Sequence, residues 1–305
     1  MRRESKVSEG VKRRHVHLKP TSQPSGVSHI AIGDIVVSAI NDGVFQASFD
    51  DLVTTDRAAC ESAHRGEFRL APPWLTINCF MIRTGDRTVL VDSGFAGKNE
   101  QVGRAAENLK AINVAPADVD TIVMTHMHPD HEAGLTDSSG KPIFPKAELL
   151  LHENELAFWR DDGAMARATP EGQGDFHLAR AALGAYGDRV RTVKTDEVAP
   201  GVRAFPTPGH TPGHTAWLVE SNGEGLLIWG DIVHFPGMQF AFPDTSVAYD
   251  IDPAAAAEAR KKVLKFVAGE KLRVAGVHLD FPAFGHVVSN GAAFRYVPEV
   301  WRPTT

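Results

Sequence analysis

The chain has 305 residues, of which 43% are hydrophobic and 23% are charged, as is usual for a globular protein. No apolar stretch approaches the roughly 18 residues that a membrane-spanning helix needs, so we expect no contact with a membrane. The net charge of −6 is unevenly spread, because residues 1–20 carry +5 and the remainder carries −11. An acidic body argues against a nucleic-acid partner, which would need clustered Lys and Arg.

The basic N-terminal segment, residues 1–26, lacks the apolar stretch of a secretory signal, so we expect a flexible tail. The alternative is that this segment forms an arm that clasps a second copy of the chain. Independently of the role of this segment, we expect a homodimer. Residues 27–305 are expected to form one domain. Cys60 and Cys79 lack the spacing of a metal site, and we expect reduced thiols and a cytoplasmic location.

In chain order, alternating apolar residues predict strands and a 3.6-residue spacing predicts helices. The expected strands are 30–40, 75–83, 88–92, 119–125, 147–151, 190–193, 202–205, 216–220 and 225–229. The expected helices are 101–112, 153–160, 176–186 and 253–267, while 52–70 is helical or irregular. The last helix is the best marked, because Asp252 caps it and Pro253 takes its first position.

The most informative segment is His126-Met127-His128-Pro129-Asp130-His131, which follows the strand-like run 121–124. Imidazole and carboxylate groups are ligands of zinc and similar metals. Alternation along the chain sends His126 and His128 the same way, and the turn through Pro129 directs Asp130 and His131 to a second point nearby. One loop could therefore supply ligands to two adjacent cations.

Three further candidate ligands each follow a strand-like run. His210 lies in the Pro- and Gly-rich loop 207–214, Asp231 ends the run 226–230, and His278 follows 274–277. Catalytic residues in α/β folds lie on loops at strand ends. We therefore expect these side chains to join the first loop at one centre.

The ordered motifs Asp92-Ser93-Gly94, 126–131, His210, Asp231 and His278 resemble those of the metallo-β-lactamase superfamily, over about residues 30 to 300. The resemblance implies an α/β fold, a four-layer αββα sandwich. It also implies that His126, His128 and His210 hold one divalent cation, that Asp130, His131 and His278 hold a second, and that Asp231 bridges both. Zinc is expected, although the same ligands accept manganese, iron or cobalt.

Within that superfamily, segments 105–111, 125–131, 155–159 and 278–286 are similar to the methyl parathion hydrolase-like group. This similarity places Trp159 in the substrate pocket, and Phe281 is added to it because it lies near His278 in sequence. Asp92 is expected to accept a hydrogen bond from a ligand imidazole and so orient it. His214 is expected to support the centre without binding metal.

His234 lies three residues after Asp231. Lactone-hydrolysing relatives often carry a Tyr there, and the parathion-hydrolase-like group is typically apolar, so a His departs from both patterns. Its imidazole could donate to a developing oxyanion or protonate a leaving alkoxide, or could merely line the pocket. Asp130, which could orient the attacking hydroxide or transfer a proton, joins Asp231 and His234 as a candidate catalytic residue.

The expected activity is attack of a metal-activated hydroxide on a carboxylic ester or lactone, with a phosphotriester as the alternative substrate. A glyoxalase II-type thioesterase is disfavoured because only 27 residues follow His278. A non-catalytic metal-binding module is also disfavoured. A seven-residue ligand set with a bridging carboxylate suits a reactive water better than a closed structural site.

Overall fold

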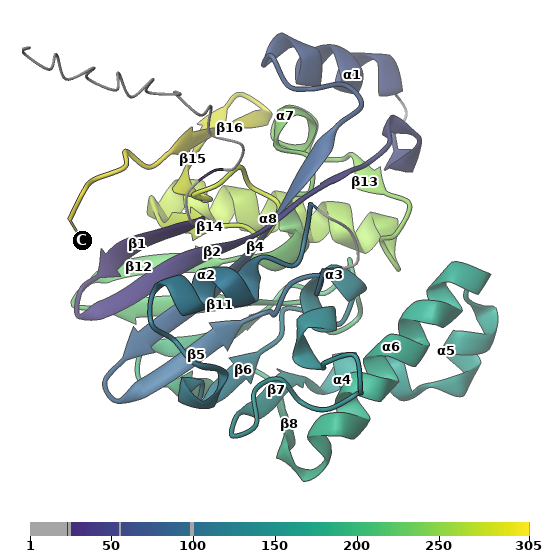
Figure 1. Ribbon diagram of the computed structural model, residues 1–305. Helices are drawn as coiled ribbons and strands as arrows, with labels where there is room; N and C mark the ends of the chain where they lie inside the picture. Colours follow the sequence, from purple (N-terminus) through teal and green to yellow (C-terminus); the bar gives the residue numbers. More distant parts are fainter. Residues whose placement is uncertain (1–22, 24–25, 55, 98–100, 305) are drawn as a thin grey trace, which may run out of the picture.

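The computed structural model describes residues 23, 26–54, 56–97 and 101–304. Two seven-stranded sheets lie at the centre of the molecule, with helices outside them (Figure 1). This arrangement confirms the predicted αββα sandwich. The predicted tail, residues 1–26, lies outside the described residues except for residues 23 and 26.

The first sheet has the order β1-β2-β4-β5-β6-β7-β8. Strands β1, β2, β4 and β5 pair in antiparallel fashion, and β5, β6, β7 and β8 pair in parallel. Its strands are β1 (Val27–Ile32), β2 (Ile35–Gln46), β4 (Trp74–Thr84), β5 (Arg87–Val91), β6 (Thr121–Val123), β7 (Glu148–His152) and β8 (Val190–Val193).

The second sheet has the order β16-β15-β14-β12-β11-β10-β9, in which β12 and β14 are parallel and the other neighbours antiparallel. Its strands are β9 (Glu197–Ala199), β10 (Val202–Pro206), β11 (Thr215–Ser221), β12 (Glu224–Ile228), β14 (Arg273–Ala275), β15 (Phe284–Asn290) and β16 (Ala293–Pro298). A small ladder joins β3 (Leu52–Val53) to β13 (Ser246–Val247).

Helices form the outer layers, and short helices lie within some of the connections between strands (Figure 1). They are α1 (Arg57–Gly66), α2 (Ala105–Ala111), α3 (Pro129–Glu132), α4 (Glu153–Arg160), α5 (Asp162–Arg167), α6 (Pro170–Tyr186), α7 (Pro236–Gln239) and α8 (Pro253–Glu270). Helix α8 begins as predicted, with the Asp252 side chain accepting a hydrogen bond from the backbone N–H of Ala255. No helix in the described part of the chain is long and apolar enough to cross a membrane.

Alternation along the strands divides the core into two layers. On β2, Val37 and Ala39 face the second sheet and join a cluster that includes Trp217 of β11 and Leu264 of α8. The next residue, Ile40, faces the other way and joins a cluster with α2, α4 and α6. Each fully buried large apolar side chain contributes roughly 1.5 to 3 kcal/mol, so the sheets form a rigid support for the loops at their ends.

One predicted strand was wrong in its limits. Residues 30–40 form parts of two strands, because the chain turns at Gly33, which has a φ of +54°, and pairs β1 with β2. The polar run at residues 41–43 does not end β2. It forms a bulge at which the register with β4 shifts, so an apparent stop in sequence is a local irregularity within a long strand.

Candidate metal centre

The predicted ligands lie on loops that leave neighbouring strands at one edge of the sandwich. The segment 126–131 follows β6, and His128 forms the N-cap of the short helix α3. His210 follows β10, Asp231 follows β12, and His278 follows β14. The structure therefore brings together the side chains that the sequence placed at separate strand ends.

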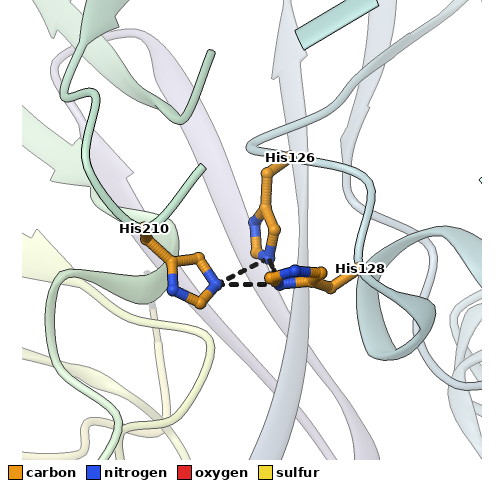
Figure 2. A group of neighbouring side chains, drawn as sticks. All are labelled: His126, His128 and His210. Atoms are coloured by element: carbon orange, nitrogen blue, oxygen red, sulfur yellow. Dashed lines mark hydrogen bonds between the residues drawn. The ribbon is translucent and has the colours of Figure 1, made fainter. Parts of the chain in front are cut away.

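Three imidazoles meet at one point (Figure 2). His126 Nε2 lies 3.0 Å from His128 Nδ1, and His210 Nε2 lies 2.9 Å from His128 Nδ1 and 3.1 Å from His126 Nε2. Burial lowers the pKa of both His126 and His128 well below the usual range, so these rings are neutral at neutral pH. Three ring nitrogens that converge in this way cannot all share protons, whereas one cation would satisfy all three lone pairs.

A second group adjoins the first. Asp130 Oδ2 lies 3.5 Å from His131 Nε2 and 3.4 Å from His278 Nε2. Within the described residues, the buried His131 Nε2 has no hydrogen-bond partner. An unsatisfied buried nitrogen is unfavourable by roughly 1 to 3 kcal/mol, and a cation held by these three side chains would remove that cost.

Asp231 lies between the two groups. Its Oδ2 is 3.3 Å from both His210 Nε2 and His278 Nε2, and its Oδ1 is 3.2 Å from His131 Nε2. Burial opposes ionisation of this carboxyl group, but the surrounding imidazoles, His131 above all, hold its pKa well below the usual range. The carboxylate of Asp231 thus contacts imidazoles of both groups.

Asp92 contacts His131 and the strand end before the first loop. Its Oδ2 accepts a hydrogen bond from His131 Nδ1 at 2.9 Å and one from Thr125 Oγ1 at 2.8 Å, and its Oδ1 accepts one from the Thr125 backbone N–H at 2.8 Å. Because Nδ1 donates to Asp92, Nε2 is the ring nitrogen of His131 that is directed at the centre. Such partners fix both the ring and its tautomer.

Two supporting groups were missed in the sequence. His210 Nδ1 donates to Asp250 Oδ1 at 2.7 Å, and His278 Nδ1 donates to the backbone oxygen of Thr76 at 2.8 Å. Burial opposes the charge on each group, but hydrogen bonds to Asp231 and to Asp250 outweigh it and raise the pKa of His210 to about 9, and the hydrogen bond from His210 lowers that of Asp250 to about 2. No sequence motif marks either partner, since each lies 40 or more residues from its histidine.

Glu155 is a third missed residue, and its carboxylate joins two of the ligand loops. It is fully buried and accepts hydrogen bonds from Met127 N at 3.0 Å, Thr211 Oγ1 at 2.6 Å and Gly213 N at 3.1 Å. A Cβ on Gly213 would lie 2.1 Å from the Glu155 backbone nitrogen, so only glycine fits there. The loop of His126 and the loop of His210 are thus held together from behind.

His214 supports Asp231 from behind. Its Nε2 accepts a hydrogen bond from the Asp231 backbone N–H at 3.0 Å, and its Nδ1 lies 2.8 Å from Thr207 Oγ1. Burial, reinforced by His210, lowers the pKa of His214 to about 3. Both ring nitrogens of His214 are therefore engaged by protein groups, and its role in supporting the centre stays a prediction.

His234 lies inside the centre, in a geometry that sequence could not reveal. Its Nε2 is 2.9 Å from Asp231 Oδ2, while its buried Nδ1 has no hydrogen-bond partner among the described residues. Burial lowers its pKa to about 4 although Asp231 opposes that shift, so the ring is neutral and has one proton. A proton on Nε2 pairs with the carboxylate, which leaves Nδ1 an acceptor. Donation to a substrate would require that proton to be released from Asp231.

The two predicted pocket aromatics differ in position. The ring of Trp159 lies 5.7 Å from the ring of His128, but the side chain is buried and its Nε1 donates to Glu155 Oε1 at 2.6 Å. Phe281 is 38% exposed and follows Asp280, which accepts two hydrogen bonds from Arg69. Trp159 therefore packs against the centre, while Phe281 lies on a more open loop.

The fold and the paired His and Asp groups define a class of metal-dependent hydrolases. Residues 72–278 match the family model of the metallo-beta-lactamase superfamily. The chain therefore belongs to this superfamily. The predicted family and class of enzyme are confirmed, and the methyl parathion hydrolase-like subgroup stays a prediction.

Several known proteins are similar to the chain. The hydrolase AbOPH in the beta lactamase superfamily, known from a crystal structure, is 30% identical in sequence to this chain. The two structures match with a TM-score of 0.87, over 92% of this chain and 100% of that one. The dizinc quorum-quenching lactonase AidC is 24% identical, with a TM-score of 0.79 over 91% and 99%. An N-acyl homoserine lactonase of Bacillus thuringiensis is 24% identical over 255 residues, which are 77% of this chain and 88% of that protein.

Proposed function

We propose that the protein is a binuclear metal-dependent hydrolase of carboxylic esters or lactones. The main support is the position of Asp231, whose carboxylate contacts imidazoles of two adjacent groups, each able to hold a cation. His126, His128 and His210 would hold one ion, and Asp130, His131 and His278 the other. A closed structural site would not need a carboxylate shared between two such groups.

Two bound cations would lower the pKa of a water towards neutrality and polarise the scissile oxygen of the substrate. The protein groups would orient the reactants around them. Asp130, whose side chain is 16% exposed, can accept a proton from the attacking water and pass it to the leaving group. We retain His234 as a candidate donor to the substrate oxygen, with the condition that its proton is first released from Asp231.

Lactones are the favoured substrates because an N-acyl homoserine lactonase matches most of the chain. A dizinc lactonase shares the fold, which supports zinc at both positions. The alternative is a phosphotriester, favoured by the similarity of residues 278–286 to the methyl parathion hydrolase-like group and by the position of Trp159 beside His128. One activated hydroxide could attack a carbonyl carbon or a phosphorus.

The test is a substrate panel run on protein of known metal content. Purified, zinc-loaded protein is assayed with aryl esters, acyl-homoserine lactones and methyl parathion. We expect kcat/KM to be highest for a lactone or ester. His286→Ala serves as a matched control, since His286 lies half-buried on β15 outside the centre and should keep full activity. Higher kcat/KM for methyl parathion would select the alternative, and metal-loaded protein that hydrolyses none of these substrates would refute both.

A further inference from the structure

Tyr249 follows β13 and lies against two residues of the centre. Its ring is 5.2 Å from the ring of His234, at an interplanar angle of 72°, and 6.2 Å from the ring of His210, at 90°. Its hydroxyl oxygen is shielded from solvent and has no hydrogen-bond partner within the described residues. Nothing in the sequence marked this residue.

The backbone beside Tyr249 is fixed to the centre. The Val247 N–H donates to Asp250 Oδ2 at 2.9 Å, and the other oxygen of Asp250 accepts from His210 Nδ1 at 2.7 Å. The Ile251 N–H donates to the backbone oxygen of His210 at 2.9 Å. The tyrosine ring therefore sits between two anchored residues and keeps its place relative to His210.

A buried hydroxyl without a partner is unfavourable by roughly 1 to 3 kcal/mol, and a phenylalanine would fill the same space without that cost. Buried polar groups in proteins almost always have partners, so an exception calls for a reason. Tyrosine hydroxyls ordinarily lose their proton only near a pH of about 10, so this group is a donor at neutral pH. A substrate oxygen entering the centre would supply the missing acceptor.

The contrast with His234 decides which donor is free. His234 Nε2 lies 2.9 Å from Asp231 Oδ2 and is engaged by that carboxylate, whereas the Tyr249 hydroxyl is not engaged by any described residue. We propose that the Tyr249 hydroxyl donates a hydrogen bond to the carbonyl oxygen of the ester or lactone, where negative charge develops during attack. This inference rests on the proposed function. The proton stays on Tyr249 throughout, so no group is transferred.

Tyr249→Phe tests this role because it keeps the ring and removes only the hydroxyl. Loss of one donor to a developing oxyanion typically lowers kcat by on the order of 10²-fold. We expect a fall of about that size in kcat for esters and lactones, with unchanged metal content and an equal or higher Tm. The product acid should also bind more weakly, which isothermal titration can measure without turnover. Tyr296→Phe on β16 is the matched control and should behave as the wild type.

A series of aryl esters with different leaving groups locates the hydrogen bond. If Tyr249 donates to the carbonyl oxygen, Tyr249→Phe lowers kcat by a similar factor for every leaving group. An effect that grows as the leaving group worsens would overturn the carbonyl assignment. If the wild type is active and Tyr249→Phe matches it in kcat and product affinity, only this inference fails. If the metal-loaded wild type hydrolyses no ester or lactone, the proposed function fails and this inference falls with it.

Discussion

The two halves of the sandwich supply donors to the centre in different ways. The first sheet contributes one loop, in which His126, His128, Asp130 and His131 lie within six residues. The second sheet contributes single side chains from three loops that span residues 210–278. The first set is brought together by one turn of chain around Pro129, although Asp92 and Glu155 support that loop from 28 or more residues away, whereas the members of the second set are brought together only by the fold.

This difference separates what a local motif can do from what the fold must add. Helix α3 places its own ligands through short-range hydrogen bonds, such as His131 N to His128 O at 3.0 Å. His210 and His278 instead rely on Asp250 and on the Thr76 carbonyl oxygen. Substitutions within the first loop should therefore act mainly by removing a ligand. In the second half, Asp250, which lies outside the candidate ligand set, should also control metal binding through its hydrogen bond to His210.

Asp231→Ala should have the largest effect, because this side chain contacts imidazoles supplied by both halves. We expect turnover to fall to background and the metal content to drop, while far-UV circular dichroism stays that of the folded protein. Steady-state kinetics and elemental analysis of the same sample provide the measurement. A variant with wild-type activity would show that the two donor sets work without a shared carboxylate.

His234→Leu asks whether the second half also supplies a group that acts on the substrate. If His234 releases its proton from Asp231 and donates it to the substrate, loss of this donor should lower ester and lactone kcat by on the order of 10²-fold. Hydrolysis of a phosphotriester with an aryl leaving group should stay level or improve, since the phenolate departs without protonation. Assays on both substrates decide the matter, and equal small effects would mean that His234 only lines the pocket.

Asp250→Asn tests the claim that a distant partner controls a ligand. The amide weakens the hydrogen bond that orients His210, and loss of such partners typically costs about 10- to 100-fold in metal affinity or activity. Competition with a chelator measures the affinity. Asp188→Asn, at an exposed position outside the centre, is the control. If both variants bind zinc as tightly as the wild type, His210 does not need its partner.

Removal of residues 1–22 should have the smallest effect, because the candidate ligands all lie beyond residue 125. Gly26 is kept, since its N–H donates to Asn108 Oδ1 at 3.1 Å. We expect an unchanged kcat and the same elution volume on size exclusion. A shift to monomer together with a large loss of activity would identify the segment as the clasping arm of a dimer.

The same contrast explains what sequence could predict. The dense motif 126–131 and the strand ends before His210, Asp231 and His278 indicated a shared centre, because ligand chemistry and strand periodicity are local properties. Glu155 and Asp250 were missed because their roles arise from hydrogen bonds to residues 28 and 40 positions away, Met127 and His210. Tyr249 was missed because its role arises from ring packing. The hairpin at Gly33 was missed because apolar alternation continues through the turn.

Metal stoichiometry tests the central claim most directly. The wild-type protein, His128→Ala and His278→Ala are saturated with zinc, freed of excess ion and measured by elemental analysis with the protein concentration known. We predict two ions per chain in the wild type and one in each variant, since the two histidines belong to different groups. One ion per chain in the wild type would contradict the binuclear centre, and two ions in either variant would contradict the assignment of the replaced histidine as an essential ligand.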